Sequence, residues 1–265
     1  MARLSKLVPP LLRPYLRRLR LELSFLADDL RTTGLRRRLN LPPARLRFKV
    51  HGNLDPEEFL RVGRQAAEEI YQALEAAGFE PPSDLGLLDF GCGVGRVTRF
   101  LADLFPSARI VGTDVDREQI AWARRHLAGL AEFLVNRPHP PLPFPPQSFH
   151  LAVALSVFTH LSREMAREWL SELARVVKPG GILVVTLMGP HAAARISPAL
   201  AQRLAAQGYL FHPGGEWAGL FPPWYQTALY TEEEARRLLS QVGEVVLYLP
   251  RGLNRHQDLA VVRLP

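Results

Sequence analysis

The chain contains 265 residues, is 47% hydrophobic, carries a formal net charge of +7 at pH 7 and has one cysteine, Cys92. This composition supports one large folded domain, or one domain with additions, and excludes an internal disulfide. No apolar run reaches the roughly eighteen residues of a membrane-spanning helix, and we expect no signal peptide. We therefore expect a cytoplasmic protein in a reducing compartment.

The positive charge is concentrated near the N-terminus. Residues 1–50 hold 13 Lys and Arg against 3 Asp and Glu, a net charge of +10, whereas the remainder carries −3. The segment Leu11–Leu30 mixes apolar residues with four arginines, which predicts an amphipathic helix. We interpret residues 1–54 as a basic helical extension. Three uses stay open for it: docking on an anionic membrane surface, which would make the protein peripheral to the membrane, phosphate contacts with nucleic acid, or packing on the body or a second subunit.

A second helix is predicted over residues 55–78, at the start of a main domain that spans residues 55–265. Asp55 and Pro56, followed by two further acids, favour a helix start. Apolar residues then repeat at helical spacing until Gly78, which ends the pattern.

The most informative segment is L-D-F-G-C-G-V-G at residues 88–95. A short apolar run ends in Asp89, glycines follow at every second position, and residues 96–105 have helical spacing, so the segment predicts strand, tight turn and helix. Such a turn lets the backbone approach a ligand, and the helix start offers unpaired N–H groups. A dinucleotide fingerprint would need a glycine where Arg96 stands, and a phosphate-binding P-loop would need a lysine that is absent. We therefore predict a nucleotide-type cofactor site.

A second predicted strand, residues 108–116, ends in two acids. Asp114 lies 23 residues after Gly91 and is the candidate partner of both ribose hydroxyls. Its charge disfavours a phosphorylated ribose such as that of NADP. Asp116 is interpreted as the cap of a helix over residues 117–128, and Val115 as cover for one face of an adenine ring.

Strands and helices continue to alternate along the chain. Strands are predicted at residues 131–136, 148–158 and 182–187, with a helix over residues 163–177. Residues 138–146 form a stiff loop, because six prolines in nine residues exclude a helix or a central strand.

Four motifs in chain order carry a resemblance to a known family. They are D-x-G-x-G-x-G at residues 89–95, L-P-F-P followed by S-F at 142–149, S-V-F-T-H-L at 156–161 and K-P-G-G at 178–181. With them, roughly residues 55–190 resemble the class I S-adenosylmethionine-dependent methyltransferase family, in its small-molecule branch (methyltransferase type 11/25-like). The resemblance implies an α/β fold with a doubly wound, seven-stranded, mostly parallel sheet. Strands at 244–249 and 258–264 would form its antiparallel C-terminal edge hairpin.

The resemblance also implies S-adenosyl-L-methionine as the cofactor. Many relatives have aspartate where this chain has Asn136 and His150, but an asparagine can still hydrogen-bond an adenine edge. Related enzymes often cover the cofactor with a leading helix, so Arg61 or Arg64 is a candidate partner of the methionine carboxylate, with an ordinary surface charge as the favoured alternative for each. The predicted cofactor-binding residues are Asp89, Gly91, Cys92, Gly93, Asp114, Val115, Asn136 and Ser156.

Residues 188–230 are predicted to be a substrate-covering insertion. The segment holds one predicted helix near residues 198–207, is otherwise rich in aromatic residues and glycine, and leaves a strand beside the cofactor crevice. We predict that His212, Trp224 and Tyr225 contact the substrate, with a small local core as the alternative use of the aromatic residues. A helix over residues 232–241 follows, opened by a capping box of Thr231 and Glu234.

The implied chemistry is an in-line SN2 transfer of a methyl group, for which the protein must align the acceptor with the sulfonium. A general base is needed only for a hydroxyl or a protonated amine, and His160, after the fourth strand, is the candidate. The alternative is that His160 only holds the strand–helix turn. His191, His212 and Tyr225 are weaker candidates for the base.

The sequence leaves the acceptor open among small-molecule, glycan and lipid-linked compounds. The alternatives are a cofactor-binding scaffold without catalysis, or an RNA or protein methyltransferase that uses the basic extension. Nucleic acid is disfavoured, because residues 155–158 read L-S-V-F where amino-group base methyltransferases carry [DN]-P-P-[YFW]. No metal site is expected, since the histidines show no ligand spacing with carboxylates or the cysteine. The oligomeric state stays open.

Overall fold

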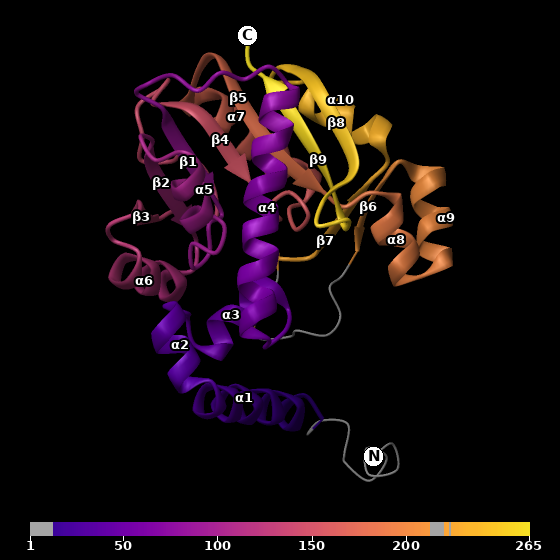
Figure 1. The fold of residues 1–265 in the computed structure, drawn as a ribbon. Helices are drawn as coiled ribbons and strands as arrows, with labels where there is room; N and C mark the ends of the chain where they lie inside the picture. The colour runs from indigo at the N-terminus through magenta and orange to yellow at the C-terminus, as the bar shows by residue number, and fades with distance from the viewer. Residues whose placement is uncertain (1–12, 213–219, 223) are drawn as a thin grey trace.

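The computed structural model describes residues 13–212, 220–222 and 224–265, and a seven-stranded sheet forms its centre (Figure 1). The strand order is β3-β2-β1-β4-β5-β9-β8. Strands from β3 to β5 pair in parallel, whereas β9 is antiparallel to both β5 and β8, which confirms the predicted sheet. The strands are β1 (Gly86–Phe90), β2 (Arg109–Asp114), β3 (Glu132–Val135), β4 (Phe149–Ala154), β5 (Val177–Leu187), β8 (Glu244–Leu253) and β9 (Gln257–Arg263).

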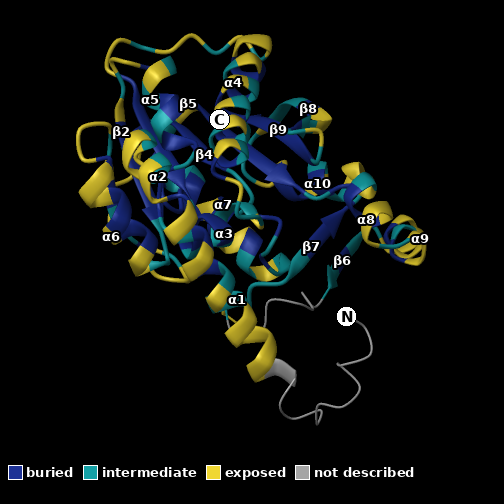
Figure 2. Ribbon diagram, turned by 60° about the horizontal axis from the view of Figure 1, so that its bottom comes forward, coloured by how far each residue is buried: buried dark blue, intermediate teal, exposed yellow. Residues whose placement is uncertain are grey.

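Helices cover both faces of the sheet, as expected for a doubly wound fold. On one face, α7 (Arg163–Val176) and α10 (Glu232–Leu239) bury their apolar side chains against the strands. On the other face, α4 (Pro56–Ala76) and α5 (Thr98–Leu104) do the same. Figure 2 shows the buried strands between these helices. Because parallel strands are covered on both faces, they read as continuous apolar runs rather than as alternating ones.

The strand order reverses next to β1. The chain passes from β1 to β2 and β3 on one side, and then returns to β4 and β5 on the other. The connections after β1 and β4 therefore diverge and leave a crevice at the carboxyl ends of these strands, where open α/β sheets bind their ligands.

Some element boundaries differ from the sequence predictions. The predicted strand over residues 148–158 ends at Ala154, because the chain turns there and Ser156 adopts a left-handed φ of 58°. The strand predicted over residues 182–187 begins at Val177, so K-P-G-G lies inside β5. Predicted caps are confirmed at α4, where Asp55 accepts from two backbone N–H groups, and at α10, where Thr231 accepts from Glu234 N.

The insertion at residues 188–230 contains more regular structure than the sequence indicated. Besides the predicted helix, now α9 (Pro198–Gln207), it holds α8 (Pro190–Ile196) and a two-stranded sheet of β6 (Tyr209–His212) and β7 (Thr227–Tyr230). The prediction missed α8 because it is only seven residues long. It missed the strands because they pair across fourteen intervening residues. The two helices and two strands share a small core of their own.

The N-terminal region forms three helices before α4: α1 (Arg13–Arg31), α2 (Thr33–Leu39) and α3 (Ala44–His51). The helix predicted at Leu11–Leu30 corresponds to α1, and its first two residues lie outside the described residues. The arginine-rich α2 and α3 were not predicted. Leu46 of α3 is buried in a core shared with α6 (Arg117–His126) and β3, so α3 packs on the body. Among the described residues, no helix is both long and apolar enough to cross a membrane.

Candidate functional site

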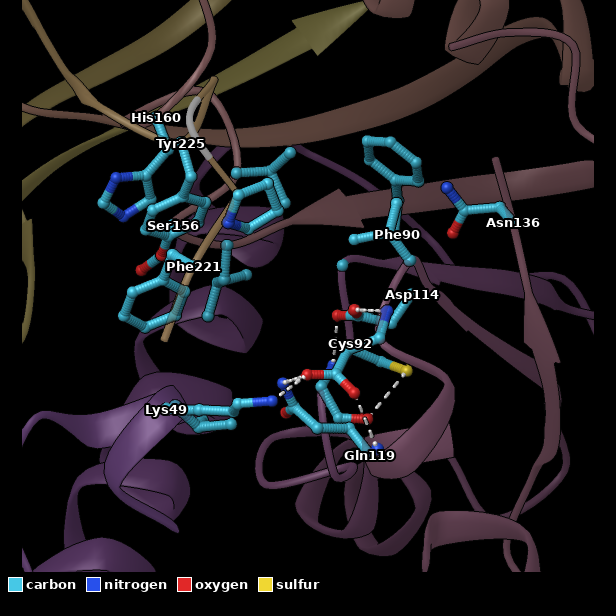
Figure 3. A pocket seen from close by; sticks show the side chains of 18 of the residues that line it. Lys49, Phe90, Cys92, Asp114, Gln119, Asn136, Ser156, His160, Phe221 and Tyr225 are labelled. Atoms are coloured by element: carbon cyan, nitrogen blue, oxygen red, sulfur yellow. Dashed lines mark hydrogen bonds and ion pairs between the residues drawn. The ribbon is translucent and has the colours of Figure 1, made fainter. Parts of the chain in front are cut away.

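A cavity of about 700 Å³ lies at the carboxyl ends of β1, β2 and β4 (Figure 3). One side is formed by the glycine turn after β1 and the acids after β2. The other side is formed by the turn after β4 and by aromatic residues of the insertion, and α3 contributes Lys49 and Val50. Its volume falls in the range of small-molecule sites.

The glycine turn adopts a backbone conformation that only glycine takes readily. Gly91 and Gly93 have φ values of 77° and 58°, and a Cβ on Gly91 would overlap the Val157 side chain. Between them, Cys92 lines the cavity with a buried thiol whose pKa is raised by burial, so the sulfur stays protonated. The turn therefore offers the cavity backbone and small side chains rather than a nucleophile.

Two carboxylates stand at the ends of β1 and β2: Asp89 is buried and Asp114 is half-buried. Asp89 accepts a hydrogen bond from Thr98 Oγ1, and burial raises its pKa to about 6, with a smaller contribution from the charge of Asp114. Asp114 accepts from Gly93 N at 2.9 Å and from Asp116 N at 2.8 Å, and burial likewise raises its pKa to about 6. Both line the cavity, and their assignment to the cofactor stays a prediction.

The two acids after β2 have separate roles. Asp116 caps α6, since its side chain accepts from the backbone N–H groups of Glu118 and Gln119, which confirms the predicted cap. It also pairs with Lys49 Nζ of α3 at 2.7 Å. Asp114 caps no helix, and the assignment of its carboxylate to a ribose stays a prediction.

Two buried acceptors at the cavity have no hydrogen-bond donor among the described residues: Asn136 Oδ1 and Gln119 Oε1. The Asn136 amide nitrogen donates to Arg137 O at 2.7 Å, which leaves its oxygen facing the cavity region (Figure 3). Unpaired buried acceptors are costly unless a ligand supplies donors. An adenosine offers such donors in its amino group and its ribose hydroxyls, so the residues present fit S-adenosylmethionine.

Positive charge reaches the cavity from residues that the sequence analysis did not select. Arg96 is half-buried, donates to His51 Nδ1 at 3.0 Å, and forms no ion pair within the described ranges. Burial lowers its pKa to about 10, so the guanidinium remains charged. The predicted Arg61 and Arg64 lie elsewhere: Arg61 is exposed beside Glu58, and Arg64 stacks over the Phe100 ring.

His160 lines the cavity beyond β4, within a stack of rings. It stacks on Tyr225 with ring centroids 3.8 Å apart, and Tyr225 stacks on Phe221 at 4.4 Å. Nδ1 of His160 lies 2.8 Å from Gln226 O, so Nδ1 carries the proton and Nε2 is an acceptor. Burial lowers the pKa of His160 to about 4, which keeps the imidazole neutral at pH 7.

The remaining predicted site residues divide between the cavity and other parts of the fold. Trp224, Val115 and Ser156 line the cavity. Ser156 also exchanges hydrogen bonds with Gln257 and donates its backbone N–H to Thr186 Oγ1. The structure does not bring His212 into the described lining; it lies in β6, paired with Thr227. In the described part of the chain, no group of metal-ligating side chains is present.

Comparison with known proteins identifies the class. Residues 87–181 match the family described as "Methyltransferase domain". A solved S-adenosylmethionine-dependent methyltransferase from Methanosarcina mazei shares the fold, with a TM-score of 0.54 at 22% identity over 69% of this chain and 93% of that chain. Residues 87–181 are thus similar to a methyltransferase domain, and the chain has the fold of S-adenosylmethionine-dependent methyltransferases.

Several curated relatives in sequence are named as methyltransferases. A malonyl-[acyl-carrier protein] O-methyltransferase from Legionella pneumophila is 30% identical over 54% of this chain and 49% of that protein. A trans-aconitate 2-methyltransferase from Methylobacterium nodulans is 35% identical over 38% of this chain and 37% of that protein. The chain thus spans half or less of the length of these relatives.

Proposed function

We propose that this protein transfers the methyl group of S-adenosylmethionine to a small organic acceptor with an apolar or aromatic part. The observation that carries the proposal is the continuity of one cavity from the glycine turn and Asp114 to the rings of His160, Tyr225 and Phe221. A polar half suited to the cofactor therefore adjoins an apolar half suited to an acceptor. Relatives named for small acids and for an acyl carrier support a small acceptor.

In this proposal each part of the cofactor has its own partner. Asp114 accepts from the ribose hydroxyls, while Val115 and Asn136 hold the adenine by its face and its edge. Arg96 takes the methionine carboxylate, because it is a half-buried cation at the cavity without a carboxylate of its own among the described residues. When bound, S-adenosylmethionine supplies an electrophilic methyl group for in-line transfer.

His160 is proposed to orient the acceptor. Its Nε2 has a free lone pair, since Nδ1 donates to Gln226 O, and so it can accept from an O–H or N–H of the acceptor. The rings of Tyr225, Phe221 and Trp224 would cover the acceptor and exclude water from the reacting atoms.

The direct test combines calorimetry with a transfer screen. Isothermal titration measures binding of S-adenosylmethionine, and a radiolabelled methyl donor is then offered with carboxylic acids, phenols, amines, sugars, lipids, RNA and protein. The proposal expects binding and labelling of a small molecule. Absence of binding contradicts it. Binding without any labelling favours the scaffold alternative, and labelling of RNA or protein alone favours the macromolecular one.

Cofactor affinity is expected to fall about tenfold from pH 7 to pH 5. Only the ionised Asp114 can accept from both ribose hydroxyls, and its pKa is raised to about 6. Above pH 6 the carboxylate is ionised and competent. As the pH falls through 6 it is protonated, and the apparent dissociation constant rises in inverse proportion to the ionised fraction. Calorimetric titrations across this pH range measure the effect.

The matched control for the pH dependence is Asp114→Asn, because the asparagine side chain has the same shape as aspartate but does not ionise in this pH range. Its affinity is expected to be lower than that of the wild type at pH 7, by about tenfold for the lost charged hydrogen bonds, and to change little with pH. A flat wild-type profile, or the same slope in both proteins, would remove Asp114 from the ribose site.

A further inference from the structure

Helix α1 presents a stripe of leucines to solvent. Leu16, Leu19, Leu23, Leu26 and Leu30 are 38%, 55%, 55%, 58% and 72% exposed. Their spacing of three and four residues places them on one helix face, which runs for about 21 Å at 1.5 Å per residue. Figure 2 shows α1 at the edge of the molecule with much of its surface exposed. Single exposed leucines are ordinary, but a continuous stripe indicates a binding surface.

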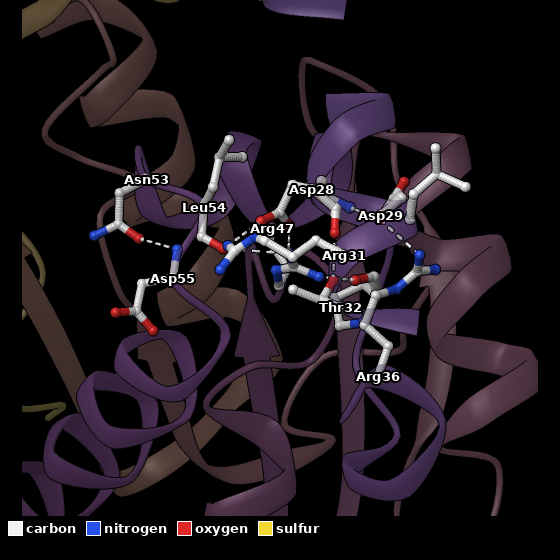
Figure 4. Close-up of polar contacts among 12 residues, drawn as sticks. Asp28, Asp29, Arg31, Thr32, Arg36, Arg47, Asn53, Leu54 and Asp55 are labelled. Carbon is white, nitrogen blue, oxygen red and sulfur yellow. Dashed lines mark hydrogen bonds and ion pairs between the residues drawn. The ribbon is translucent and has the colours of Figure 1, made fainter. Parts of the chain in front are cut away.

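The opposite face of α1 packs against the body, so the leucine stripe faces solvent. Phe25 packs on Phe48 of α3 with ring centroids 5.3 Å apart. Asp28 is buried and forms an ion pair with the fully buried Arg47 of α3 (Figure 4). These contacts set the rotation of α1 about its axis.

The charges around the stripe are unbalanced. The three acids of α1 are all engaged within the chain: Glu22 with Arg45, Asp28 with Arg47 and Arg31, and Asp29 with Arg36. In contrast, several exposed arginines of α1 and α2 have no carboxylate partner among the described residues. These are Arg17, Arg18, Arg20, Arg37 and Arg38.

We infer that α1 docks on an anionic phospholipid membrane, with its leucines at the boundary of head groups and acyl chains and the unpaired arginines beside lipid phosphates. An apolar helix face combined with unpaired arginines is the pattern of interfacial helices. A second copy of this chain would bring arginines against arginines, and the acids that could offset them are already paired. Nucleic acid would use the arginines but leave the leucines in water. The inference does not rest on the proposed methyl transfer.

Helix α1 lies at the same end of the sheet as the cavity, namely the end at which the parallel strands finish. Figure 1 shows α1, α2 and α3 together at one end of the molecule. Residues Arg47 and Phe48 of α3 hold α1, and the next two residues, Lys49 and Val50, line the cavity. A membrane-bound molecule would therefore hold its cavity close to the lipid surface.

The test is co-sedimentation of the full chain, without cofactor, with vesicles of phosphatidylcholine alone or with about one third phosphatidylserine. Binding is expected only to the anionic vesicles and is expected to weaken in high salt. Two double variants test the face: Leu19→Ser with Leu26→Ser, and Arg17→Gln with Arg18→Gln. Each is expected to lower the partition coefficient by about tenfold or more.

Matched controls remove the same chemical groups from exposed positions elsewhere. They are Leu130→Ser with Ile196→Ser, and Arg167→Gln with Arg203→Gln. Both are expected to bind like the wild type, and circular dichroism checks that all variants are folded. Equal binding by all variants, or no binding to anionic vesicles, overturns the inference. Light scattering tests the alternative of a second copy. If the wild type is a dimer that does not bind vesicles, and Leu19→Ser with Leu26→Ser makes it a monomer, the leucine face binds a second copy of this chain.

Discussion

His160→Ala is expected to lower the turnover number for methyl transfer by about 100-fold while leaving the affinity for S-adenosylmethionine unchanged. The reason is positional: Nε2 is the free acceptor in the apolar half of the cavity, and the stack with Tyr225 fixes the plane of the ring. The proposed partners of the cofactor, Asp114, Asn136 and Arg96, follow or end strands β1, β2 and β3, whereas His160 follows β4. Turnover is measured with the acceptor from the screen, and affinity by calorimetry.

The pH profile separates this role from that of an ordinary histidine base. Because burial lowers the pKa of His160 to about 4, the imidazole is neutral throughout pH 6 to 8, and His160 itself should add no inflection to turnover in that range. His212→Ala serves as the matched histidine control and is expected to keep the wild-type rate. An unchanged rate in His160→Ala, or an inflection near pH 6.5 that this variant abolishes, would contradict the assignment.

Arg47→Met is expected to destabilise the packing of α1 on α3 by about 3–5 kcal/mol. Arg47 is fully buried and pairs with the buried Asp28, and it also donates to Pro42 O and Leu54 O (Figure 4). Removing the guanidinium would leave a buried carboxylate without its partner. Hydrogen–deuterium exchange should show amides of α1 and α3 exchanging about 100-fold faster or more.

The double variant Arg47→Met with Asp28→Leu provides the control. Replacing both partners by apolar side chains removes the uncompensated charge, so much of the lost protection is expected to return. Arg45→Met, at a half-buried position of the same helix whose ion pair with Glu22 is long (3.9 Å) and solvent-accessible, should change exchange little. Equal exchange in wild type and Arg47→Met would mean that this ion pair does not hold α1.

The cofactor half of the site was largely predictable because it depends on local backbone chemistry. Gly91 and Gly93 must be glycine for a turn with positive φ, and acids at strand ends are recognisable from sequence. The capping pattern of the following helix correctly identified Asp116 as its cap. Arg96 directly follows the glycine turn, and this position alone could have indicated it as a candidate beside Arg61 and Arg64.

The rest of the site depends on contacts between distant segments. Lys49 and Val50 lie about forty residues before the glycine turn, and nothing in a short arginine-rich helix indicates that it lines a cavity. Likewise, the aromatic residues were recognised as a group, but sequence could not separate Tyr225, which stacks on His160, from His212, which pairs within β6. Those outcomes depend on non-local strand pairing.

By itself, the sequence determined the sheet, its helices and the turn at Asp89–Gly95, because periodicity, caps and positive-φ glycines act within a few residues. Only the tertiary structure decided which charges enter the cavity, which nitrogen of His160 is free, and that α1 is held with its leucines outward. Each of these follows from burial and pairing between elements far apart in the chain. Composition could report the excess of arginine near the N-terminus, but only the fold revealed which arginines are already paired.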